Sequence, residues 1–303
     1  MPHIRREFYT TLGQMRRIID EPLLTDLLPS SAPHNVSSRV LRLGLAIAAF
    51  ASLEKYLAAR VEVMTQALST SPISASSLTD ELRSFVSIDA ILGLANRISF
   101  EDPTSKQAFA DMQLAALAKY SETPPSYIGL GFSPKGSNVA ETDIGRALKA
   151  FGVQKVWERL AQVSSDIGGG AISLKANFIN LAKTRHRSAH EPASNIPSGD
   201  LKTHIETTVL IAACFDCISI SIVRSMALAT NYLGYKASLD ADVLQYRFVD
   251  REISGDWVER SADGVTVRKR SVVESVALAA ALARPGTAIV IQRDEQGIPL
   301  AVI

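Results

Sequence analysis

The spacing of apolar residues changes once along the chain, and this change constrains the fold more than any other feature. Up to about residue 235 apolar residues recur at helical spacing, as Phe8, Leu12 and Met15 do near the start. From Asp242 onward they alternate with polar residues, as they do in strands. The sequence therefore predicts a mainly α protein with a small C-terminal α+β domain.

Breaks in the helical pattern divide the first domain, which we place at residues 1–235. The longest regular segment runs from Val40 to Leu68 and has a wide apolar face, so we expect a central helix there. Glycine and proline mark the ends of the other helices. Beyond the N-terminal helix, we expect these at residues 78–98, 105–120, 142–163 with a break near Phe151 and Gly152, 172–189 and 201–229.

Residues 240–303 predict a small domain with the element order ββαββ. The stretches LQYRFVDRE and DWVERSADGVTVRKR alternate like strands, SVVESVALAAALA is a short helix, and the tail TAIVIQRDEQGIPLAVI is a hairpin. About 60 residues are marginal for an independent fold. We therefore expect this domain to dock on the helical body or on a partner.

Composition limits the class of function. The chain has 32 Lys and Arg against 31 Asp and Glu, a net charge of +1, so any RNA contact must be local. Cys214 and Cys217 lie three apart in an apolar run, which suits neither a disulfide framework nor a four-ligand zinc site, and we interpret them as core residues.

The sequence also favours a cytoplasmic protein with no membrane partner. The N-terminus MPHIRREFYT has no apolar region of the kind found in secretory signals. The apolar run from Val209 to Val223 is short for a membrane span and contains Asp216. A buried helix is the better interpretation, and the Asp216 carboxylate then needs a partner inside the protein.

The candidate chemistry lies in the segment RHRSAH, from Arg185 to His190. Residues five apart are separated by about 140° on an ideal helix, so these two share a face only where the helix ends or distorts between them. Pro192 predicts such an end. Cations such as Lys183 and Arg187 near a helix C-terminus also oppose the partial negative charge there, which explains a basic cluster without any catalytic role.

The run LAKTRHRSAHEP resembles the motif of the HEPN superfamily, in which an Arg precedes a polar residue and, a few residues later, a His. It looks most like the RiboL-PSP-HEPN branch, where a RNxxAH-like run closes the penultimate long helix. SLEKYL in a long early helix, the phrase IGRALKAFGVQKVW and a final long helix follow the same layout. The resemblance covers residues 4–235 and implies a HEPN-type helical bundle.

This resemblance implies a metal-independent endoribonuclease that needs no cofactor. The 2′-hydroxyl of the RNA attacks the adjacent phosphate and leaves a 2′,3′-cyclic phosphate and a 5′-hydroxyl. Such chemistry needs a group that transfers protons near neutral pH and a fixed cation, which suit His190 and Arg185 respectively. We expect His186, which stands where Asn is commoner in the family, to orient Arg185 or contact RNA together with Arg187 and Lys183.

The resemblance also implies partners. HEPN domains place two motifs opposite each other across a dimer, so we expect a symmetric homodimer that binds RNA. A toxin controlled by an antitoxin or regulatory protein, or an effector of phage defence, is the expected setting. Glu54 in SLEKYL matches an acidic residue of related proteins and is expected to reach Arg185 or line the cleft; a solvated Glu paired with Lys55 is the alternative.

Two other functions stay open. The first is a HEPN scaffold without catalytic activity that binds RNA or a partner protein. The second is a metal hydrolase in which His186 and His190, four apart on one helical face, act as ligands beside Glu191. That pair lacks the Glu of an HExxH motif, and a third ligand would have to be a carboxylate.

Overall fold

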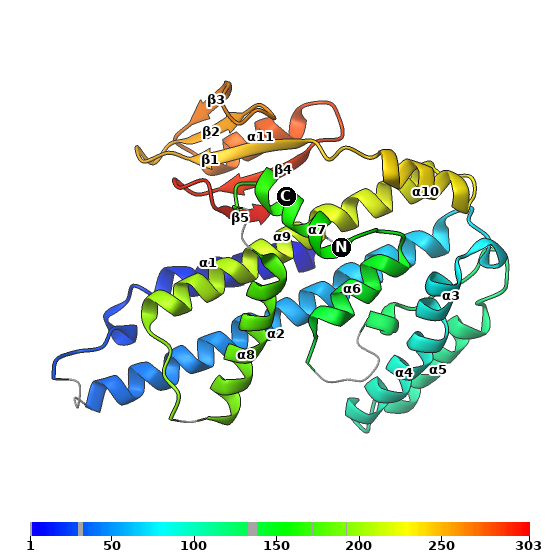
Figure 1. Cartoon of the computed structure of the whole chain (residues 1–303), viewed down its shortest axis with the longest axis horizontal. Coiled ribbons are helices and arrows are strands. Elements are labelled where there is room, and N and C mark those ends of the chain that lie inside the picture. The colour runs from blue at the N-terminus through cyan, green and yellow to red at the C-terminus, as the bar shows by residue number, and fades with distance from the viewer. Residues whose placement is uncertain (1, 30–32, 133–137, 171–172, 192) are drawn as a thin grey trace. The chain divides into compact units, whose positions relative to one another are not determined.

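The computed structural model describes residues 2–29, 33–132, 138–170, 173–191 and 193–303, and these form a series of helices followed by a small sheet (Figure 1). The prediction of a mainly α protein with a C-terminal α+β part is confirmed. The helices before the sheet are α1 (Pro2–Ile18), η1 (Pro22–Leu24), α2 (Pro33–Thr70), η2 (Ala75–Ser77), α3 (Asp80–Val86), α4 (Ile88–Phe100), α5 (Lys106–Ala118), η3 (Gly129–Phe132), α6 (Glu141–Ala150), α7 (Val156–Asp166), α8 (Leu174–His190), α9 (Ser198–Leu228) and α10 (Tyr232–Ala241).

Helix boundaries follow the sequence signals closely, with one helix split in two. The predicted central helix is α2, with 38 residues. The helix expected over residues 78–98 is broken at Ser87, whose φ of −120° and ψ of −77° lie outside the helical region, so it forms α3 and α4. The break near Gly152 is confirmed, and its φ of 87° is a conformation that glycine adopts without a steric penalty.

Helix α10 is an addition to the predicted helices, which end at residue 229. Asn231 starts this helix: its Oδ1 accepts the N–H of Gly234 at 2.8 Å and caps α10. The buried hydroxyl of Tyr235 in α10 donates to the carbonyl oxygen of Phe151. This bond ties α10 to the turn between α6 and α7.

The C-terminal sheet has five strands in the order β3-β2-β1-β4-β5, in which β1 and β4 are parallel and the other pairs antiparallel. Its elements are β1 (Tyr246–Arg251), β2 (Trp257–Arg260), β3 (Val267–Ser271), α11 (Glu274–Ala283), β4 (Ile289–Arg293) and β5 (Pro299–Val302). Ala277 and Ala281 of α11 pack on Val249 and Val290 of the sheet. Small alanine side chains allow this close approach of helix and sheet.

The predicted order ββαββ is corrected to βββαββ. The stretch DWVERSADGVTVRKR forms two strands, β2 and β3, because it turns back at Asp263. The Asp263 carboxylate accepts the N–H groups of Val265 at 3.0 Å and Thr266 at 3.2 Å, which fixes the turn. The carboxylate also accepts a hydrogen bond from the Ser261 hydroxyl. This bond, and then the two backbone bonds, lower the pKa of Asp263 to about 2.

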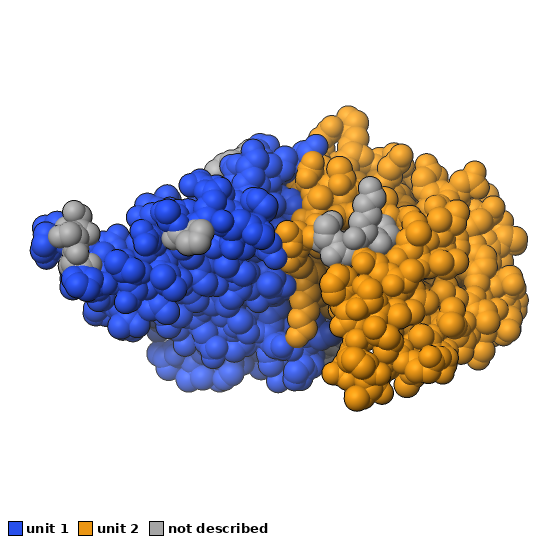
Figure 2. Space-filling model, turned by 90° about the horizontal axis from the view of Figure 1, so that it is seen from below, with its two compact units in different colours: residues 1–53, 160–217, 244–303 blue, residues 54–159, 218–243 orange. Residues whose placement is uncertain are grey.

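The chain forms two compact units, which Figure 2 shows in different colours. Unit 1 comprises residues 1–53, 160–217 and 244–303, and unit 2 comprises residues 54–159 and 218–243. The sheet therefore groups with residues 1–53 and 160–217 of the helical region. The division into domains at residues 1–235 and 240–303, which follows the change from helix to strand, stays a prediction.

Within unit 1 the sheet docks on helices. Nη2 of Arg16 in α1 lies 2.6 Å from Oδ2 of Asp294 and 2.9 Å from Oε1 of Glu206 in α9. A Cβ atom at Gly168, between α7 and α8, would lie 2.4 Å from the carbonyl oxygen of Gly297 in the β4–β5 turn. The expected docking of the small domain thus takes place on the chain's own helices.

Two described helices, α2 and α9, are long and apolar enough to cross a membrane if length and composition alone are considered. In the most apolar stretch of α9, 78% of the residues are buried inside the protein, against 39% for α2. Core helices of folded domains have the same composition, so this property alone is weak evidence for a membrane.

Candidate functional site

Helix α8 carries the RHRSAH motif in its last turns. The Ser173 side chain accepts the N–H of Ala176 at 3.4 Å and caps the start of the helix; residue 172, where the sequence predicted the start, lies outside the described residues. Phe178 packs on Phe50 of α2 with ring centroids 5.8 Å apart. The helix ends at His190, one residue beyond the predicted end.

Arg185 lies on the packed side of α8. The buried residues Leu174, Phe178, Leu181 and Ser188 follow one helical stripe, and Arg185 continues it, four residues after Leu181. Its side chain is half-buried, and its Nε atom is buried without a hydrogen-bond partner among the described residues. The buried hydroxyl of Ser188, three residues on, is in the same situation.

The two histidines of the motif lie on the solvent side. His186 and His190 are both exposed, and their ring centroids are 4.6 Å apart with a 48° angle between the planes. This contact follows from their i, i+4 spacing. Arg187 Nε lies 3.5 Å from Oε2 of Glu191, and Lys183 is exposed one turn earlier, so the end of α8 presents a compact group of basic side chains.

The helix does not end between Arg185 and His190, as the motif was expected to require. Both residues are helical, so about 140° separates their directions around the axis. Within one chain, His190 therefore lies beside His186 on the exposed side of α8, whereas Arg185 lies on the side that packs against the core. Arg185 and His190 line neither the cavity beside α1 nor the one around Tyr120 and Pro124.

Glu54 belongs to unit 2, where its Oε1 atom accepts the backbone N–H of Val139 at 2.6 Å. That bond fixes the segment before α6. The expected role of Glu54 beside Arg185 stays a prediction.

The structure shows where the candidate metal ligands lie. Among the described residues, no three His, Cys, Asp or Glu side chains gather closely enough to hold a metal ion. Cys214 and Cys217 are fully buried and unbridged in α9, which confirms that they are core residues. Burial raises the pKa of the Cys214 thiol well above its usual value.

His204 is a buried histidine in unit 1 that the sequence did not single out. It is 6% exposed in α9 and hydrogen-bonds the backbone of Ala46 in α2, while its Nε2 atom is buried without a partner among the described residues. Burial lowers its pKa to about 4. No local sequence signal marks this position, because its surroundings come from another helix.

The structure also contains a cavity that the sequence did not indicate. Its volume is about 770 Å³, and it lies within unit 1, between α1, α9 and the C-terminal sheet. Its walls come from segments more than 200 residues apart in the chain, such as Arg6 and Trp257. The only trace of this cavity in the sequence is the spacing of the α1 arginines along one helical face.

Compared with known protein families, curated proteins and solved structures, the chain shows no significant match to any of the three.

Proposed function

We propose that the chain is a metal-independent endoribonuclease of HEPN type that acts as a homodimer. The observation that carries the proposal is the exposed pair of histidine rings, 4.6 Å apart, within a basic group at the end of α8. Exposed imidazoles can reach a substrate and transfer protons to or from it, and the surrounding cations attract a phosphodiester backbone. The resemblance of RHRSAH to the HEPN motif assigns these groups to RNA cleavage.

In the proposed reaction His190 takes the proton of the 2′-hydroxyl as the oxygen attacks the adjacent phosphorus. The bond from phosphorus to the 5′-oxygen then breaks, and that oxygen takes up a proton from the protonated form of a histidine. Positive charge from Arg185 stabilises the phosphorane-like transition state. His186, Arg187 and Lys183 hold the flanking phosphates.

The position of Arg185 supports the homodimer in this proposal. Arg185 and His190 of one α8 point in directions about 140° apart, so a single helix does not present both to one phosphate. A second α8 opposite the first supplies the missing group from its own motif. The proposed toxin or phage-defence setting, with an antitoxin or regulatory partner, rests on the resemblance alone.

The test is an RNA-cleavage assay in excess EDTA with the wild-type chain and the variants Arg185→Ala and His190→Ala. We expect cutting that survives chelation, products with 2′,3′-cyclic phosphate ends, and losses of about 100-fold or more in both variants. Lys175→Ala is the matched control, since Lys175 is an exposed cation in the first turn of the same helix. DNA of the same sequence should stay intact because it lacks the 2′-hydroxyl.

A second function, a HEPN scaffold that binds RNA or protein without cutting, is favoured by the half-buried position of Arg185 on the packed stripe of α8. The same assay separates the two. If the wild-type chain binds a broad panel of RNAs and cuts none, the scaffold replaces the nuclease. If EDTA abolishes the cutting, a metal hydrolase replaces the metal-independent nuclease as the proposed function.

A further inference from the structure

The cavity between α1, α9 and the C-terminal sheet has the size and lining of a ligand site. Its volume of about 770 Å³ falls within the range of about 300 to 1,000 Å³ typical of small-molecule pockets. All of its walls belong to unit 1. The ion pair between Arg16 and Asp294, which both line the cavity, holds α1 against the sheet beside it.

One wall is a cationic stripe on α1. Arg6, Thr10, Gly13 and Arg17 recur at intervals of four, three and four residues, so they follow one helical face, and all four line the cavity. Gly13 leaves this wall open, since a Cβ atom there would meet nothing within 4 Å. Lys202 of α9 adds a third cation.

Two other arginines of the cavity, Arg5 and Arg16, are paired with carboxylates, whereas Arg251 of β1 has no ion pair among the described residues. Arg5 pairs with Asp216, and Arg16 pairs with Glu206 and Asp294. Arg6, Arg17 and Lys202 form no ion pair among the described residues. Three cations around a hollow are suited to an anionic group, and guanidinium groups bind phosphate through paired hydrogen bonds.

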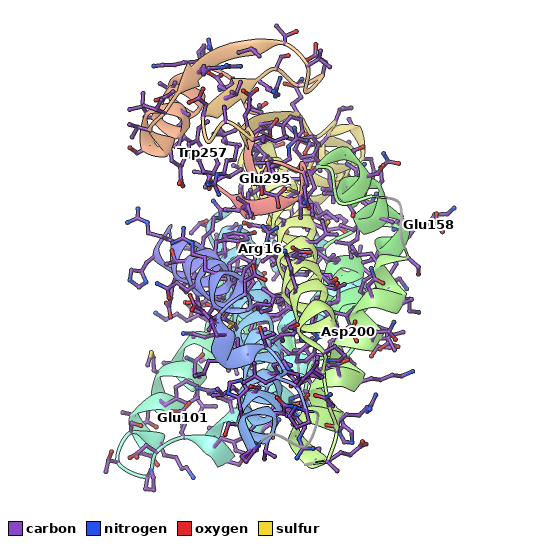
Figure 3. The ribbon with its side chains drawn as sticks, turned by 90° about the vertical axis from the view of Figure 1, so that its left-hand side faces the viewer. Arg16, Glu101, Glu158, Asp200, Trp257 and Glu295 are labelled. Atoms are coloured by element: carbon purple, nitrogen blue, oxygen red, sulfur yellow. The ribbon has the colours of Figure 1, made fainter. Side chains whose placement is uncertain are left out.

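The wall formed by the C-terminal sheet and α11 includes apolar side chains and an aromatic ring among polar ones. Trp257 of β2 and Leu278 and Leu282 of α11 line the cavity, and the Leu282 side chain is 54% exposed. In the view of Figure 3, Glu295 of the β4–β5 turn is labelled between Trp257 of the sheet and Arg16 of α1. An indole ring is a stacking surface for a planar aromatic group.

Carboxylates also line the cavity and restrict the chemistry of the ligand that it can bind. Asp20, after α1, and Glu295, in the β4–β5 turn, line the cavity and accept hydrogen bonds only. A ligand that is purely anionic would meet repulsion from them. A ligand that carries hydroxyl or amino donors beside its anionic group satisfies both kinds of side chain.

We propose that this cavity binds a nucleoside monophosphate. The phosphate binds Arg6, Arg17 and Lys202, the base stacks on Trp257, and the ribose hydroxyls or the amino group of the base donate to Asp20 and Glu295. The proposal is independent of RNA cleavage at α8. A bound nucleotide would hold the C-terminal sheet against α1.

Calorimetric titration of the full chain with the four nucleoside 5′-monophosphates tests the proposal. We expect saturable binding of at least one of them, with adenosine, ribose 5-phosphate and inorganic phosphate each about tenfold weaker or more, because each lacks part of the recognised chemistry. The His190→Ala variant should bind equally well, which separates this cavity from the proposed cleavage site.

Variants locate the binding. Arg6→Ala with Arg17→Ala should weaken it about tenfold or more, whereas Arg268→Ala with Lys269→Ala, which removes the same charge from exposed positions of β3 outside the cavity, should leave it unchanged. Trp257→Leu should weaken binding, and Trp257→Phe should retain most of it. Both α1 positions are exposed, so their double variant should fold.

Four results would overturn the proposal. The first is the absence of binding by any of the four nucleotides at millimolar concentration. The second is equal weakening by the α1 and β3 double variants. The third is inorganic phosphate or adenosine binding as tightly as the nucleotide, and the fourth is decanoate, an apolar anion, binding more tightly than all of them.

Discussion

Arg5 in α1 binds Asp216 in the middle of α9 through two contacts, Nε to Oδ2 at 2.8 Å and Nη2 to Oδ1 at 3.1 Å. The Asp216 side chain is fully buried, and the Arg5 side chain is 23% exposed. A carboxylate in such a place is desolvated, and two contacts from one guanidinium offset that cost. The pair therefore fixes the N-terminal helix α1 against the long apolar helix α9.

Replacing Arg5 by Leu should lower the free energy of unfolding by about 3 kcal/mol, because the buried Asp216 carboxylate then loses its guanidinium. Urea denaturation followed by circular dichroism measures the change. Arg6→Leu is the matched control: this neighbouring side chain is exposed, so the effect should stay within about 0.5 kcal/mol. Equal losses in the two variants would contradict the importance of the buried pair.

Gly168 should tolerate no side chain. Its φ of 98° is unfavourable for alanine, and a Cβ atom would lie 2.4 Å from the backbone oxygen of Gly297, which cannot rotate away. We expect Gly168→Ala to cost about 2 kcal/mol or more in urea denaturation. Gly170→Ala, with a φ of 76° and nothing within 4 Å, should cost only about 1 kcal/mol. If both variants lose the same amount, the hairpin does not pack against Gly168 as described.

Local patterns predict those parts of the fold that depend on local chemistry. The helical period identified α2 and α9, and Gly152 marked the break between α6 and α7. Helix α10 was not predicted, because an Asn such as Asn231 is equally common after the end of one helix and at the cap of the next. The sequence also required a partner for Asp216 but did not identify Arg5, because the two are 211 residues apart and meet only through packing.

The candidate site shows the same division. Pro192 indicated the end of α8, and the spacing of His186 and His190 sufficed to place their rings together. The packed position of Arg185 can also be predicted from the sequence, because Arg185 follows Leu181 by four residues on the apolar stripe. The cavity beside α1 cannot, because its two walls come from opposite ends of the chain.

The stability of unit 1 should fall in mild acid because of His204. Burial lowers the pKa of His204 from 6.5 to about 4, so between these values the unfolded chain binds a proton that the folded chain does not. Stability therefore rises with pH across this window and is lost as pH falls, by up to about 3 kcal/mol between pH 7 and pH 4. Urea denaturation at several pH values measures it.

The variant His204→Asn isolates this contribution from that of the carboxylates. The Asn amide can donate to the Ala46 backbone as the imidazole does, but it does not titrate. The difference in unfolding free energy between wild type and variant should therefore change by about 3 kcal/mol between pH 7 and pH 4. A constant difference would show that His204 is not desolvated in the folded chain.

If the proposed cleavage site needs the motifs of two chains, an inactive chain that pairs with a wild-type chain should abolish its cleavage activity. With a ninefold excess of a variant that carries both Arg185→Ala and His190→Ala, and with random exchange of subunits, about one wild-type chain in ten meets another wild-type chain, and a mixed dimer has no site with both groups. Cleavage per wild-type chain should then fall to about a tenth, whereas a ninefold excess of the Lys175→Ala control should not lower it. Activity that stays proportional to the wild-type chain alone would mean that each chain cuts by itself. In that case Arg185 and His190, about 140° apart on α8, act on one phosphate only after the end of the helix unwinds.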